Sequence, residues 1–163
     1  MLNLPQALDR DAIARRIPHQ GAMCLLDAVL SWSGEGIRCE TRSHADPAHP
    51  LRAYGRLGAA CGVEYAAQAM AMHGALVAEG LGRPPAETQS RGGYLAGLRA
   101  VTLHVERLDD VPGPLTVAAQ RITGDANTVL YSFTLDAGNQ PLLSGRAIVV
   151  LDASGLAAQR TSP

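Results

Sequence analysis

The order of apolar and polar positions along the chain predicts one hairpin, a long central helix and then four strands. Residues 56–78, RLGAACGVEYAAQAMAMHGALVA, form a continuous apolar stretch of helical length, built mainly from Ala, Gly and Met. Before it, residues 23–32 form an apolar run, and residues 37–44 alternate between apolar and polar side chains with the period of a strand. Glycines lie between these two runs, so a hairpin is expected there.

Turn signals divide the second half of the chain into four strand-like segments. Pro- or Gly-containing turns separate the segments 94–108, 115–123, 128–136 and 142–151. A short helix is expected at residues 9–16, with Asp9 as its cap and Pro18 as its stop. Residues 80–93 are rich in Gly and Pro and are expected to form a loop within one domain rather than a linker between two.

The apolar stretch at 56–78 fits the interior of a protein better than a membrane. It has about the ~20-residue length of a bilayer span, but it contains Glu64, Gln68 and His73. Ionisable groups in the hydrocarbon core cost several kcal/mol each. A helix that is apolar on all sides must be surrounded by protein or by lipid, and these ionisable residues favour protein. We therefore expect an α+β fold in which a curved antiparallel sheet wraps the long central helix.

Size and charge narrow the class of protein further. The 163 residues suggest a single domain at 1–152, followed by a frayed tail at 153–163. A formal net charge of -1 gives no electrostatic reason to expect nucleic acid binding. The three cysteines are far apart and odd in number, which argues against a disulfide framework and a zinc site. We expect no secretory leader, no membrane span and a cytoplasmic location.

Glu64 and Gln68 carry the chemistry of the central helix. Residues four apart lie one above the other on a helix, so these two side chains share a face. Burial of the carboxylate would raise the pKa of Glu64 and make it a candidate proton donor near neutral pH. The plainer alternative is a buried acid that only binds backbone groups.

Three segments, in this order, resemble the β-hydroxyacyl-(acyl carrier protein) dehydratases of the hot-dog superfamily. IPHQGAMCLLD at 17–27 resembles their opening Pro-His-Arg segment, which runs into an apolar strand closed by Asp. VEYAAQA at 63–69 resembles their helix motif, in which a catalytic Glu is followed four residues later by a supporting Gln. YLAGL at 94–98, with the later VPG turn, resembles a third family segment. The resemblance covers residues 13–151 and is closest to the divergent subgroup of aryl polyene pathways, through SHADPAHPLR and AAQAMAMHGAL.

The resemblance implies the hot-dog fold and a dehydration reaction. A 3-hydroxyacyl thioester, carried on the phosphopantetheine arm of acyl carrier protein, would lose water and become the trans-2-enoyl thioester. In the family, one subunit supplies a histidine and its partner the glutamate, so a homodimer or a hot-dog heterodimer is expected. The resemblance implies neither a cofactor nor a metal ion.

Such a dehydration needs a base for the C2 proton, an acid for the departing hydroxyl and donors for the thioester oxygen. Glu64 is the expected acid, and Gln68 is its expected support on the substrate-binding side. Backbone N–H groups at the start of the helix, around Gly58 and Ala59, are the expected donors for the oxygen.

Two histidines are candidates for the base. The family places this histidine in a Gly-His-Phe-Pro-Gly loop before the glutamate, and His49 occupies the matching place without the Phe-Pro-Gly. His44 ends the preceding strand-like run and is the second candidate. The other three histidines are expected to be structural: His19 as a loop anchor, His73 in the interior and His104 on a solvated strand face.

The sequence is also compatible with two other functions. The altered histidine loop is compatible with a non-catalytic or weakly active hot-dog subunit that binds acyl thioesters beside an active partner. The same fold also hosts acyl thioesterases, because a fold by itself does not determine a reaction.

Overall fold

The computed structural model describes residues 7–82 and 93–150. Its elements in chain order are β1 (Leu8–Asp9), α1 (Arg10–Ala14), η1 (Gly21–Met23), β2 (Ala28–Ser33), β3 (Gly36–Thr41), η2 (Ser43–Ala45), η3 (Ala59–Cys61), α2 (Gly62–Gly80), β4 (Tyr94–Leu103), β5 (Leu115–Gly124), β6 (Thr128–Ala137) and β7 (Gln140–Val150). The strands form one seven-stranded sheet in the order β1-β2-β3-β5-β6-β7-β4, and every neighbouring pair is antiparallel.

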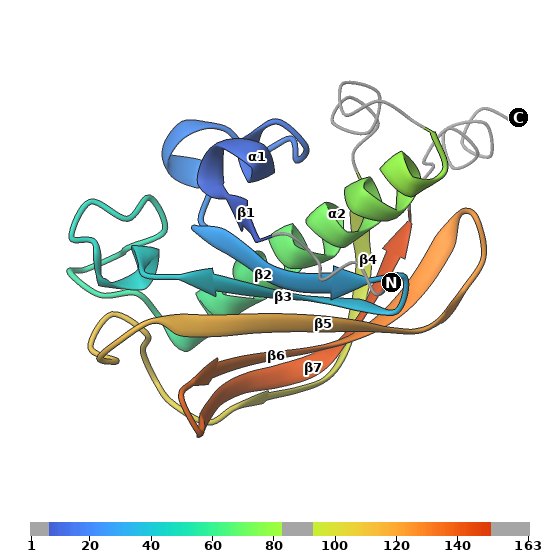
Figure 1. The fold of residues 1–163 in the computed structure, drawn as a ribbon. Helices are drawn as coiled ribbons and strands as arrows, with labels where there is room; N and C mark the ends of the chain where they lie inside the picture. Colours follow the sequence, from blue (N-terminus) through green and yellow to red (C-terminus); the bar gives the residue numbers. More distant parts are fainter. Residues whose placement is uncertain (1–6, 83–92, 151–163) are drawn as a thin grey trace, which may run out of the picture.

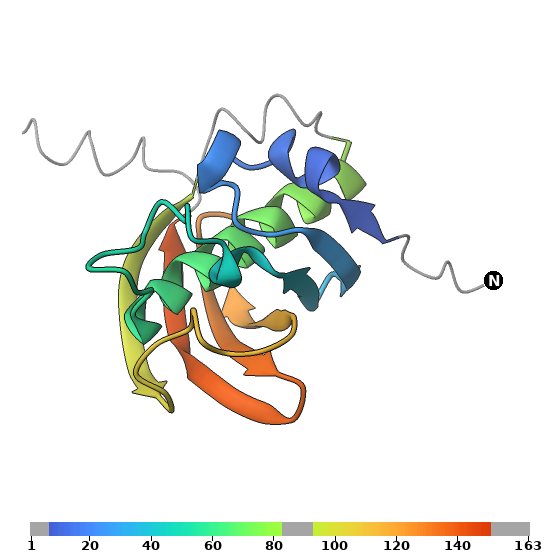
Figure 2. The same cartoon turned by 90° about the vertical axis from the view of Figure 1, so that its left-hand side faces the viewer.

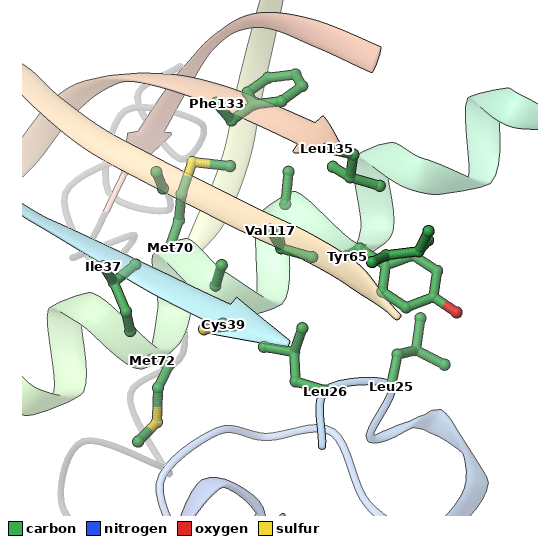
Figure 3. Close-up of a cluster of buried hydrophobic side chains, with 14 of the residues drawn as sticks. Leu25, Leu26, Ile37, Cys39, Tyr65, Met70, Met72, Val117, Phe133 and Leu135 are labelled. Atoms are coloured by element: carbon green, nitrogen blue, oxygen red, sulfur yellow. The ribbon is translucent and has the colours of Figure 1, made fainter. Parts of the chain in front are cut away.

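The sheet curves around α2, as Figures 1 and 2 show. α2 packs against β3, β5 and β6, and its side chains fill the concave face of the sheet. Figure 3 shows this core, in which Tyr65, Met70 and Met72 of α2 meet side chains of the sheet that include Cys39, Val117, Phe133 and Leu135. The predicted α+β architecture, a long helix wrapped by an antiparallel sheet, is confirmed. This is the hot-dog fold.

A glycine lets the start of α2 approach the sheet closely. A Cβ atom built on Gly62 would lie 2.6 Å from Cδ2 of Leu143 and 3.0 Å from Cδ2 of Leu135. Both leucines are fully buried, so neither has free space to move into. The absent side chain therefore fixes how near the first turn of α2, which carries Glu64, lies to β6 and β7.

The segment Cys24–Asp27 differs from the prediction of an apolar run that enters a hairpin. Its residues Cys24, Leu25 and Leu26 are buried, but β2 begins only at Ala28. The backbone of Leu25 bonds to side chains instead of to a neighbouring strand: its N–H donates to Gln68, and its carbonyl accepts from Thr41 and Ser43. Long-range side-chain bonds thus replace the strand ladder at Leu25, and backbone pairing with β3 begins at Asp27, whose N–H donates to the carbonyl of Glu40 at 2.9 Å.

Other boundaries shift by a few residues. β4 ends at Leu103, not at residue 108, and a 3-10 turn at Ala59–Cys61 precedes α2. The short N-terminal helix is limited to α1, with Asp9 as its cap through a 2.9 Å bond from the N–H of Ala12. Most of the expected loop at 80–93, the end of the last strand and the tail at 153–163 lie outside the described residues.

β4 forms one edge of the sheet and leaves apolar side chains uncovered. Its partners in β7 include the buried residues Leu143, Ala147 and Val149, and cross-strand partners share a face. On that inner face, Leu98 is 42% exposed and Leu103 is 48% exposed. The described chain therefore does not complete its own apolar surface along β4.

None of the helices within residues 7–82 and 93–150 has the length and apolar character needed to cross a lipid bilayer.

Candidate active site

Glu64 lies on the first turn of α2, and two side chains hold one of its carboxylate oxygens. Oε1 accepts a hydrogen bond from Nε2 of His19 at 2.9 Å and one from Nε2 of Gln68 at 3.2 Å. Among the residues that the structure describes, Oε2 has no hydrogen-bond partner. The side chain of Glu64 is 33% exposed. One oxygen is thus fixed by the protein, and the other remains free for a bound molecule.

Gln68 connects α2 to the chain segment before β2. It is fully buried, and its carbonyl oxygen accepts from the N–H of Leu25 at 2.9 Å. Its amide nitrogen donates to the carbonyl of Met23 at 2.7 Å as well as to Glu64. The shared helix face predicted for Glu64 and Gln68 is therefore present, and the same amide fixes both the carboxylate and the neighbouring loop.

His19 is the residue of this site that sequence reasoning missed. We predicted a loop anchor, but its ring lies against the Glu64 carboxylate and is 24% exposed. Nδ1 of the same ring is buried and has no hydrogen-bond partner in the described part of the chain. The available signal was the Pro-His pair inside the segment that resembles the family, and we interpreted it as structural because the matching family position usually is.

The direction of the pKa shift at Glu64 corrects our prediction. We expected burial to raise it, whereas the hydrogen bond from His19 lowers the pKa of Glu64, burial opposes this, and the bond from Gln68 lowers it further. The first turn of α2 is half-exposed in the single chain, so desolvation is weaker than an enclosed helix would impose. In this chain Glu64 is a carboxylate at neutral pH.

His49, the preferred base, is buried in a hydrogen-bond chain of its own. Its Nδ1 accepts from the N–H of Leu51 at 3.0 Å, so in the neutral ring the proton is on Nε2. That Nε2 donates to the hydroxyl of Tyr65 at 2.9 Å, and Tyr65 is hydrogen-bonded to Ser43 at 2.7 Å. Burial lowers the pKa of His49, and nearby Arg52 lowers it further. Both ring nitrogens are occupied within the chain.

His44, the second candidate, is also internal. It is 1% exposed, and its Nε2 donates to the carbonyl of Val111 at 3.0 Å. Its Nδ1 is buried without a hydrogen-bond partner in the described ranges. Neither His44 nor His49 contacts Glu64 within the same chain by a hydrogen bond that the structure describes.

The two predicted backbone donors differ in availability. The N–H of Ala59 donates to the carbonyl of Glu106 at 3.0 Å, so it is not free for a substrate oxygen. Gly58 and Arg107 form an antiparallel bridge between these two bonded pairs, because the N–H of Leu108 donates to the carbonyl of Leu57 on the other side of Gly58. Gly58 and Arg107 are therefore a non-hydrogen-bonded pair, so the N–H of Gly58 points away from Arg107. No described residue accepts a hydrogen bond from this N–H, which leaves it available for a substrate oxygen.

Of the remaining histidines, His73 is interior as predicted, and His104 is exposed as predicted but lies after the strand rather than on it. His73 is buried, with Nδ1 2.7 Å from the Tyr131 hydroxyl and Nε2 donating to the carbonyl of Ser33 at 2.9 Å. This is a satisfied interior histidine. His104 lies just after β4 and is exposed.

Residues 11–158 match the model of the ApeP-like family, described as ApeP dehydratase. The chain belongs to the ApeP-like dehydratase family. This confirms the resemblance to hot-dog dehydratases of the aryl polyene type that the motifs indicated. Dehydration is therefore the reaction class of the family to which the chain belongs. A search of curated protein sequences gives no significant match.

Solved structures support the same fold. The dehydratase heterocomplex ApeI:P from Xenorhabdus doucetiae aligns with a TM-score of 0.77 at 20% identity, over 96% of this chain and 99% of that chain. A mutant thioesterase from Staphylococcus aureus aligns with a TM-score of 0.53 at 11% identity, over 76% of this chain and 91% of that one. A mutant thioesterase from Pseudomonas aeruginosa gives 0.50 at 15% identity, over 75% and 78%. At these identities the likeness concerns the fold alone.

Proposed function

We propose that this chain catalyses the dehydration of a 3-hydroxyacyl thioester, carried on acyl carrier protein, to the trans-2-enoyl thioester. The observation that carries the proposal is the state of the Glu64 carboxylate. His19 and Gln68 hold Oε1, while Oε2 is left without a partner among the described residues on a half-exposed turn of α2. Membership of a dehydratase family gives this geometry its reaction class.

The elimination assigns a task to each group. A base removes the C2 proton, the electrons of that C–H bond form the C2–C3 double bond, and the C3–O bond breaks. Oε2 of protonated Glu64 gives its proton to the departing hydroxyl, which leaves as water. Negative charge develops on the thioester oxygen, and the outward N–H of Gly58 is the donor that remains available for it. Gln68 positions Glu64 and the loop beside it.

The base comes from a second hot-dog chain in this proposal. In a homodimer it is His49 of the second copy. To accept the C2 proton, its Nε2 has to be unprotonated, so the ring must exchange its bonds to Tyr65 and Leu51 and carry its proton on Nδ1. The uncovered apolar face of β4 gives such a second chain a surface to bury. Formation of the dimer also removes water from Glu64, which raises its pKa toward the range in which an acid works.

A second candidate function follows from the geometry of His49. Its ring is 5% exposed, and Leu51 and Tyr65 occupy both nitrogens. This favours a chain that is inactive or weakly active alone and supplies its Glu64 to a heterodimer, in which another hot-dog protein supplies the imidazole. The carrier protein and a cytoplasmic location are part of both versions.

The experiment compares purified wild-type chain with the Glu64→Gln variant, using a 3-hydroxyacyl thioester on acyl carrier protein. Mass spectrometry of the carrier-bound acyl chain follows the loss of water. Glutamine keeps the shape of the side chain but cannot give up a proton, so we expect activity to fall by about 10²-fold or more. Glu35→Gln, at an exposed glutamate in the β2–β3 turn, is the matched control.

Three outcomes decide between the versions. Normal turnover by Glu64→Gln refutes the assignment of Glu64. Activity that appears only after a second hot-dog protein is added supports the heterodimer over the homodimer. Release of free carrier thiol without loss of water identifies a thioesterase and refutes the dehydration.

A further inference from the structure

His19 reaches Glu64 from a loop that is itself firmly held. Between α1 and η1, the side chain of Gln20 donates to the carbonyls of Ala14 at 2.9 Å and Ile17 at 3.3 Å. Arg10 donates to the carbonyls of Gly21 at 2.8 Å and Cys24 at 2.9 Å. The loop therefore has fixed backbone contacts on both sides of His19, and the 2.9 Å contact with the carboxylate is not the chance position of a free side chain.

We propose that His19 is a positioning residue for Glu64, which binds Oε1 in the same chain and directs Oε2 toward the substrate. This inference rests on the proposed function, because it assigns a role within that reaction. It differs from the expectation that the imidazole facing the glutamate comes only from a partner subunit. Here the imidazole of His19 comes from the same chain and binds Oε1 of Glu64, whereas Oε2 faces the substrate.

The chemical role of His19 concerns the carboxylate that remains after proton transfer. When Oε2 loses its proton to the departing hydroxyl, negative charge appears on both carboxylate oxygens. The N–H groups of His19 and Gln68 already point at Oε1, and hydrogen bonds to a charged acceptor are stronger than those to a neutral one. The transition state is therefore stabilised by donors that need no rearrangement.

The groups that face Glu64 are few. His19, from the loop before η1, is the titratable group that acts on its pKa in the described chain, and Gln68, from α2 itself, is neutral. Activity requires protonated Glu64, so the rate falls as the pH rises through the pKa of Glu64. Substitution of His19 removes the largest influence that lowers the pKa of Glu64. The alkaline limb of the pH–rate profile, where the rate falls as Glu64 loses its proton, should therefore move to higher pH.

The test uses two substitutions at residue 19 and a control. His19→Leu removes the donor, whereas His19→Gln keeps an N–H near the position of Nε2. His104→Gln changes an exposed histidine whose ring has no hydrogen bond in the described ranges. The titration of the Glu64 carboxyl group is followed in each protein through the NMR signal of its carboxyl carbon. The values of kcat and KM and the pH–rate profile are measured with the 3-hydroxyacyl carrier-protein substrate, in the presence of any hot-dog partner that activity requires.

We expect His19→Leu to raise the pKa of Glu64, to shift the pH limb upward and to lower kcat by about 10- to 100-fold, the range of one hydrogen bond to a charged group. KM should change little, and His19→Gln should recover much of kcat. An unmoved Glu64 titration and pH limb in folded His19→Leu would overturn the inference, while dehydration by the wild type still supports the proposed function. Because the titration needs no turnover, it reports the contact of His19 with Glu64 separately from activity. A wild type without dehydratase activity overturns both proposals.

Discussion

Replacement of Gln68 by Met tests the connection between α2 and the segment before β2. Gln68 is fully buried and makes three hydrogen bonds: from Leu25 N–H at 2.9 Å, to Met23 carbonyl at 2.7 Å and to Glu64 at 3.2 Å. Met and Gln have similar length and similar helix propensity. The Gln68→Met variant therefore removes the hydrogen bonds without a large cavity or a change in the helix.

The magnitude follows from the groups that lose their partner. A buried backbone group left without a hydrogen bond costs about 1–3 kcal/mol. Two such groups are affected, the N–H of Leu25 and the carbonyl of Met23. The bond to Glu64 adds less, since that carboxylate is 33% exposed and water can replace the amide. We expect a total loss of about 2–5 kcal/mol, which lowers the melting temperature by roughly 5–15 °C for a chain of this size.

The assay is urea and thermal unfolding at one fixed protein concentration, because the proposed dimer would make the midpoint depend on concentration. Gln120→Met, at an exposed glutamine on β5, is the control and should change stability by no more than about 0.5 kcal/mol. If Gln68→Met lowers the free energy of unfolding by no more than this control does, the Gln68 amide does not hold the segment before β2 against α2.

Three further predictions follow. Tyr65→Phe removes the hydroxyl that binds Nε2 of His49 and should destabilise the chain by about 1–3 kcal/mol in urea unfolding, because the buried ring nitrogen loses its partner. Burial lowers the pKa of His73, so the folded chain binds fewer protons there than the unfolded chain; stability should fall as the pH drops below about 7 and less so in His73→Gln. Leu98→Glu should dissociate the proposed dimer, as measured by light scattering, whereas Ile122→Glu, at a similarly exposed apolar residue, should not.

The sequence predicted the parts of the fold that local patterns encode. The strand-like segment 128–136, bounded by turn signals, forms β6 almost without change, and the apolar stretch forms α2. The segment 24–27 was less predictable, because the backbone of Leu25 is satisfied by the side chains of Gln68, Thr41 and Ser43 rather than by a strand. No local period encodes a side chain that bonds to a distant backbone.

The same distinction applies to the candidate site. Glu64 and Gln68 are four residues apart on one helix, so their contact could be predicted from spacing alone. The contact between His19 and Glu64 depends on how the loop before η1 folds over α2, and spacing says nothing about that. The direction of the pKa shift was wrong for a related reason. We expected the helix to be enclosed on all sides, but one face of α2 consists of small side chains that are half-exposed in the single chain.

That open face links assembly to chemistry. Val63, Ala67 and Ala71 are half-exposed on α2 at helical spacing, and Glu64 lies at their border. Small residues cover little surface, so this face stays accessible in one chain but allows another helix or sheet to approach closely. A second hot-dog chain that covers it would bury the apolar face and desolvate Glu64 in the same step. Because desolvation raises the pKa of a carboxyl group, Glu64 is a carboxylate in the lone chain, and the proposed assembly would shift its pKa toward the range in which it can donate a proton. Dilution should therefore remove activity before it removes folded structure.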